Sequence, residues 1–153
     1  MNTEQATQKQ IDYLETLSKR ITARIEREES DAAQENQHAA YKARQFVLNY
    51  AIPIKLWKLV EFDFENLDKR QASMLIDAMK RSDNPAHFME AVDQNDSLLP
   101  LIGEAARQFL LWLEENMEEL RRDGVSEYAA VKRYESEQES ASGKDQIATE
   151  RQA

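Results

Sequence analysis

Apolar residues recur every three or four positions over residues 98–122, which predicts a long amphipathic helix. The members of this apolar stripe are Ile102, Ala106, Phe109, Leu113, Met117 and Leu120. Asp96 or Ser97 can cap the start of the helix, and Gly124 follows its last turn. Pro100 suits the first turn, where its missing N–H is not needed. We expect the rest of the chain to pack around this helix.

A second clear helical pattern covers about residues 8–28. Thr7 and Gln10 have the spacing of a capping box at its start. The apolar stripe that follows consists of Ile11, Leu14, Leu17, Ile21 and Ile25. Apolar spacing resumes over residues 39–50 and predicts another helix, which should end or kink near Pro53.

Three further helix starts are indicated after residue 67. Asp68 and Gln71 form another capping-box pair, and the helix that they open should bury Ala72, Leu75, Ile76 and Met79. Asn84 and Pro85 suit the start of a short helix that carries Phe88, Met89 and Val92. Ser126 can cap a last short helix with Tyr128, Val131 and Tyr134.

Two stretches leave alternatives open. Residues 54–60 are strongly apolar apart from two lysines, so they could form a buried helix or a short strand; the lack of a partner strand nearby favours a helix. Residues 28–37 are polar and could be a loop or an exposed continuation of helix. Residues 136–153 have almost no apolar content, which predicts a disordered tail. We therefore predict one all-α domain over residues 1–135, an irregular bundle of about five or six helices around the 98–122 helix.

The acidic charge is concentrated in one part of the chain. The 153 residues carry a net charge of −9, whereas residues 1–82 have 13 acidic and 13 basic residues. Residues 83–125 have 10 acidic and 3 basic residues, a net charge of −7. On the predicted 98–122 helix, the side opposite the stripe carries Glu114, Glu115, Glu118 and Glu119. This acidic face either keeps the protein in solution or recognises a basic partner.

The residues needed for common catalytic and metal chemistry are sparse. The chain has no cysteine, only two histidines, and three isolated glycines that form no phosphate-binding loop. Glu35 and His38 have the spacing found in di-iron bundles, but such a site needs two copies of the motif and two more glutamates. We predict a non-catalytic protein without a cofactor or bound metal. No apolar run reaches the ~18 residues that span a bilayer, so a cytoplasmic protein is expected.

Two classes of function fit these patterns. An adaptor or assembly protein would bind another protein, or a second copy of itself, through apolar side chains left over after core formation; the candidate anchors are Trp57, Leu101, Leu111 and Trp112. Alternatively, an acidic inhibitor or nucleic-acid mimic would use the acidic face to occupy a basic groove of a nucleic-acid-processing complex. Direct nucleic-acid binding is disfavoured because residues 1–82 have no net positive charge. The basic residues of the 8–28 helix could touch phosphate, but they alternate with acids as on a mixed, solvated face.

A short resemblance covers about 30 of the 153 residues. The run from Ala6 to Leu17 resembles an "Ala-Thr-x-Lys-Gln-x-x-Tyr-Leu-x-x-Leu" module of uncharacterised bacterial and phage-type proteins. In those proteins a "Leu-x-Lys-x-x-Ala-Ser-x-x-Ile" helix commonly follows, and the matching residues here are Leu67, Lys69, Ala72, Ser73 and Ile76. About 50 residues separate the two halves in this chain. The resemblance implies a phage or other mobile element as the source, and no activity or site.

Overall fold

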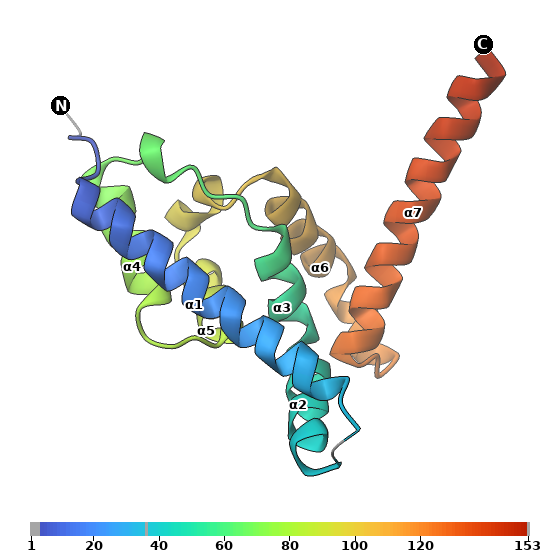
Figure 1. Cartoon of the computed structure of the whole chain (residues 1–153). Coiled ribbons are helices and arrows are strands. Elements are labelled where there is room, and N and C mark those ends of the chain that lie inside the picture. Colours follow the sequence, from blue (N-terminus) through green and yellow to red (C-terminus); the bar gives the residue numbers. More distant parts are fainter. Residues whose placement is uncertain (1–3, 36, 153) are drawn as a thin grey trace.

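Helices account for nearly all of the regular structure. The computed structural model describes residues 4–35 and 37–152. Its α-helices are α1 (Gln8–Ala32), α2 (Gln37–Asn49), α3 (Ala51–Leu59), α4 (Lys69–Met79), α5 (Pro85–Gln94), α6 (Glu104–Arg122) and α7 (Glu127–Gln152), with the 3₁₀ helices η1 (Phe64–Asn66) and η2 (Asp96–Leu101). Among the described residues the only β pairing is an isolated bridge between Gln5 and Asp68. The all-α prediction is confirmed (Figure 1).

The two predicted capping boxes both form, and they lie side by side. At the start of α1, the side chains of Thr7 and Gln10 each accept a hydrogen bond from the backbone N–H of the other residue. Asp68 and Gln71 do the same at the start of α4. The Gln10 side chain also donates to the Lys69 carbonyl at 3.3 Å. The starts of α1 and α4, 59 residues apart at this hydrogen bond, are therefore neighbours in space.

Helix α1 spans the molecule and packs against α4 near its start and α2 near its end (Figure 1). Its buried stripe consists of Leu14, Leu17, Ile21 and Ile25. The helix ends at Ala32 and a turn follows through Glu35, so the polar 28–37 stretch is partly helix and partly turn; residue 36 lies outside the described residues.

Helix α3 lies at the centre of the bundle. The apolar stretch that could have been helix or strand is helical, and it packs against α2, α5, α6 and α7. Its buried side chains are Ala51, Pro53, Ile54, Leu56 and Trp57. Helix α6 packs mainly against α3 and α7, so it is not the helix around which the bundle is built. The central position belongs to α3 because it is apolar on almost every side.

The predicted 98–122 helix is divided into two elements. Residues 96–101 form η2, capped by Asn95 rather than by Asp96 or Ser97, and α6 begins only at Glu104. Gly103 separates them with φ 91° and ψ 159°, a conformation that no helix contains. Pro100 lies inside η2, not in the first turn of α6. The stripe itself is otherwise correct: Ile102, Ala106, Phe109, Leu113 and Leu120 are buried.

Helix α7 differs most from the expectation. Residues beyond Glu135 were expected to be disordered, whereas α7 continues as a helix to Gln152; residue 153 lies outside the described residues. Glu, Gln, Lys, Arg and Ala favour helix even without an apolar stripe, which the tail sequence lacks. Side chains from Ser136 to Ala141 are exposed, and the end of α7 extends away from the other helices (Figure 1). The boundary of the domain at residue 135 stays a prediction.

Candidate functional site

A largely apolar groove lies between α5, η2 and α6. It has a volume of about 580 Å³. Its apolar lining comes from three elements and consists of Met89, Val92, Leu99, Leu110, Leu111, Leu113 and Met117. Its polar lining consists of Asp93, Asp96, Arg107 and Glu114.

The groove exists because α6 carries more apolar residues than the core can cover. Phe109 and Leu113 face inward and are buried. Leu111 is 47% exposed, and Met117, which we predicted to be part of the buried stripe, is 39% exposed. Leu113 belongs to both surfaces, since it is buried and yet lines the groove. Large apolar groups at the mouth of a concave surface are typical of a binding site.

Carboxylates lie on both walls of the groove. Asp93 and Asp96 come from α5 and η2, and Glu114 comes from α6. Asp93 keeps one side in solvent, but partial burial raises its pKa above the ordinary value of 3.8. Arg107, the one cation of the lining, donates to the Leu99 carbonyl at 3.2 Å and to Glu104 at 2.6 Å.

The predicted acidic face is exposed in full. Glu114, Glu115, Glu118 and Glu119 all have exposed side chains on α6. Only Glu114 also lines the groove. The groove and the acidic face are thus adjacent surfaces that share one residue.

The structure separates the four predicted apolar anchors. Trp57 is buried: its ring packs edge-on against Phe88, with centroids 5.1 Å apart, and its Nε1 donates to the Thr22 hydroxyl at 3.0 Å. Trp57 therefore belongs to the core and cannot anchor a partner. Trp112 is half-buried and packs against Tyr134, with centroids 5.2 Å apart, while its Nε1 donates to Glu137. Leu101 is half-buried as well. Leu111 alone among the four lies in the groove.

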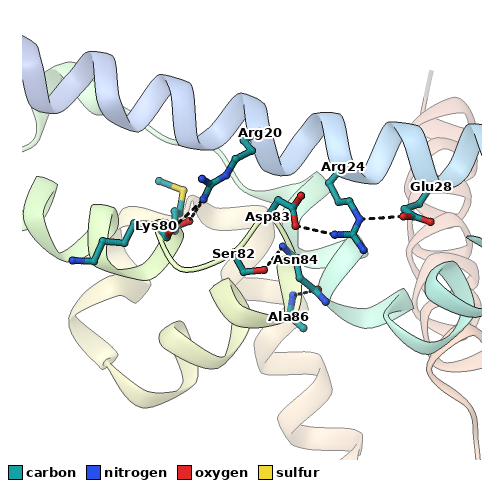
Figure 2. Close-up of polar contacts among 9 residues, drawn as sticks. Arg20, Arg24, Glu28, Lys80, Ser82, Asp83, Asn84 and Ala86 are labelled. Carbon is teal, nitrogen blue, oxygen red and sulfur yellow. Dashed lines mark hydrogen bonds and ion pairs between the residues drawn. The ribbon is translucent and has the colours of Figure 1, made fainter.

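Two of the basic residues of α1 that could have touched phosphate, Arg20 and Arg24, instead bind other parts of the fold (Figure 2). Arg20 donates to the carbonyls of Met79 at 3.1 Å and Lys80 at 3.4 Å, at the end of α4. Arg24 binds Glu28 at 3.1 Å and Asp83 at 2.8 Å. The guanidinium of Arg24 also lies 4.6 Å from the centre of the Phe46 ring. These contacts connect α1 to α2 and to the turn between α4 and α5.

The sequence contained only part of the groove signal. On α6, the apolar residues outside the stripe, such as Leu110 and Leu111, indicate a surface wider than one core contact. The opposite wall, with Met89, Asp93 and Leu99, could not be found because its position depends on how α5 and η2 pack. Among the described residues, no group of three His, Asp or Glu side chains is placed to hold a metal ion, and none of the described helices is both long and apolar enough for a membrane span.

Comparisons of this chain with protein-family models, with curated proteins and with solved structures found no match. The function must therefore be argued from the groove and its residues.

Proposed function

We propose that this chain is a non-catalytic interaction protein that captures an apolar helical segment of another protein in the groove between α5, η2 and α6. The observation that carries the proposal is the largely apolar lining, which includes the exposed side chains of Leu111 and Met117. Exposed apolar side chains of this size are costly in water unless a partner covers them.

The dimensions of the groove support a helix as the captured element. Its lining on α6 runs from Arg107 to Met117, ten residue steps that correspond to about 15 Å of helix. A partner helix of about three turns would cover this length and place its apolar stripe in the groove. Met89 and Met117 lie in the lining, and flexible methionine side chains adapt to differently shaped apolar partners.

The methionines provide a direct test with the full chain. The methyl groups would be labelled with ¹³C, and an amphipathic helical peptide with Leu on one face and Gln elsewhere would be added. We expect the NMR signals of Met89 and Met117 to shift, since both line the groove, while Met79, which is 1% exposed on α4, stays unchanged. Leu111→Gln should weaken the binding. Shifts confined to methionines outside the groove, or no shift at all, would reject the proposal.

A second candidate function is supported by the exposed acidic face. Glu114, Glu115, Glu118 and Glu119 present four carboxylates on consecutive turns of α6, as an inhibitor of a basic nucleic-acid-binding groove would. Such binding needs no apolar contact, so it would survive Leu111→Gln. Replacing the four glutamates by Gln would abolish it.

A further inference from the structure

We infer that the captured helix is basic, with Lys or Arg on both sides of its apolar stripe. This inference rests on the proposed function, because it names the chemistry of the partner that the same groove accepts. The partner is identified by charge complementarity with the two walls of the groove.

The arrangement of the carboxylates calls for cations on two flanks rather than one. Asp93 and Asp96 lie on the wall formed by α5 and η2, and Glu114 lies on the α6 wall. A helix seated between the walls has its polar residues on either side of the buried stripe. Cations at those positions would face a carboxylate on each side.

These three carboxylates are available to a partner. Within the described part of the chain, no ion pair involves Asp93, Asp96 or Glu114, whereas carboxylates such as Asp83 and Glu104 are already bound by arginines. All three carboxylates of the groove thus differ from Asp83 and Glu104 in having no cationic partner among the residues that the structure describes, although all five lie in the acidic segment 83–125.

Arg107 does not cancel this charge. Its guanidinium donates to Glu104 at 2.6 Å and to the Leu99 carbonyl at 3.2 Å, so its positive charge is already paired with a carboxylate. Desolvation also makes the Asp93 carboxylate costly to ionise when the groove is empty. A cation placed beside Asp93 would offset this cost, and the apolar surroundings would strengthen the attraction.

Three peptides separate the charge of the partner from its apolar stripe. Each would be an amphipathic helix of about 16 residues, roughly 24 Å long, with the same Leu positions. The flanking positions would be Lys in one peptide, Gln in the second and Glu in the third. Fluorescence anisotropy with the full chain would measure the dissociation constants at low and physiological salt.

We expect the Lys peptide to bind roughly tenfold more tightly than the Gln peptide at low salt, because three partly exposed ion pairs each add a modest amount. The Glu peptide should bind most weakly. The advantage of Lys over Gln should shrink as salt rises, since exposed charges are screened.

A matched pair of triple variants shows where the charge acts. Asp93→Asn, Asp96→Asn and Glu114→Gln together should remove most of the advantage of the Lys peptide over the Gln peptide. The control, Glu15→Gln, Glu26→Gln and Glu65→Gln, removes the same charge at exposed positions that do not line the groove. It should behave like the wild type.

The outcomes distinguish the two claims. Equal affinity for the Lys and Gln peptides would overturn the inference of a basic helix and leave the groove as the site. If both triple variants lose the preference for the Lys peptide equally, the attraction comes from the net charge of the protein and not from the groove. That result would also overturn the inference of a basic helix. Failure of all three peptides to bind would reject the proposed function itself.

Discussion

Gly103 lies directly against Glu61. The backbone N–H of Glu61 donates to the carbonyl of Ile102 at 2.9 Å, and a Cβ placed on Gly103 would lie 3.0 Å from the Glu61 Cβ and 3.1 Å from its backbone nitrogen. The segment that follows α3 therefore supports the backbone at the break between η2 and α6. η2 belongs to one wall of the groove and α6 forms the other, so this contact helps to set the angle between the two walls.

Replacing Gly103 by Ala should destabilise the protein by about 1–3 kcal/mol, since the added methyl meets backbone and φ 91° suits only glycine. Gly124→Ala is the control: its φ is 63°, and its added Cβ would meet nothing within 4 Å. It should cost about 1 kcal/mol. Urea unfolding of both variants measures the difference. Equal losses would show that the contact with Glu61 adds nothing.

The apolar stripe of α6 should divide into two energetic classes. Phe109→Ala should cost about 3–5 kcal/mol and Leu113→Ala about 2–5 kcal/mol, because both side chains are buried. Met117→Ala should cost less than about 1 kcal/mol, because this side chain is 39% exposed in the groove. Thermal or urea unfolding gives the three values. A large loss at Met117 would mean that the groove is closed in solution.

Glu127 should hold the start of α7 on the start of α3. Tyr50 caps α3 without a side-chain hydrogen bond, and Glu127 supplies the missing acceptor to the Ile52 N–H at 3.2 Å. Glu127→Ala should cost about 1 kcal/mol and accelerate hydrogen exchange at Ile52. Glu127→Gln keeps an acceptor oxygen and should remain close to the wild type. Unchanged exchange at Ile52 in the Ala variant would contradict this role.

Asp93 should make stability fall as the pH rises. Burial raises its pKa in the folded state above the ordinary 3.8, so the folded protein binds this proton more tightly than the unfolded chain does. The extra stability is present below the ordinary pKa and is lost as the pH rises through the raised pKa of the folded state. Asp93→Asn should remove this loss, and melting temperatures across that pH range would show it. NMR titration of the Asp93 carboxyl carbon with a midpoint at or below 3.8 would contradict the assignment.

The contributions of the groove and of the acidic face to binding can be compared by removing three negative charges from each. Glu115→Gln, Glu118→Gln and Glu119→Gln alter only the acidic face, whereas the groove triple variant alters Asp93, Asp96 and Glu114. We expect the groove variant to weaken binding of the Lys-flanked peptide more, since its carboxylates lie beside the apolar lining. Stability should change little in the acidic-face variant, because Gln keeps the helix propensity of Glu. The opposite ranking of affinities would favour the nucleic-acid mimic.

Local signals in the sequence predicted most of the helices correctly. Both capping boxes begin helices at the expected residues, and Asn84 accepts from the Ala86 N–H at the start of α5. These signals succeed because a cap and the first turn of its helix involve neighbouring residues only. Four members of the predicted α1 stripe, Leu14, Leu17, Ile21 and Ile25, are buried, whereas Ile11 near the start of the helix is only half-buried.

The errors arise where distant segments decide the structure. The apolar periodicity continues through Gly103 and therefore predicted one unbroken helix. The break is stabilised by Glu61, which lies about 40 residues earlier in the sequence, so local patterns could not reveal it. Trp57 was a candidate anchor, yet its side chain donates to Thr22 and packs against Phe88 in the core. The groove was missed for the same reason, because its second wall depends on the packing of α5 and η2 against α6.

The long-range contacts of α1 have a consequence for synthesis of the chain. Gln10, Arg20 and Arg24 find their partners in and after α4 between 59 and 63 residues later in the sequence. A nascent chain therefore leaves the ribosome with α1 complete and its apolar stripe uncovered until α4 and the following turn have emerged. At typical rates of ~5–20 residues per second this interval lasts several seconds. During it, the apolar stripe of α1 must be covered by a chaperone or by α2 alone.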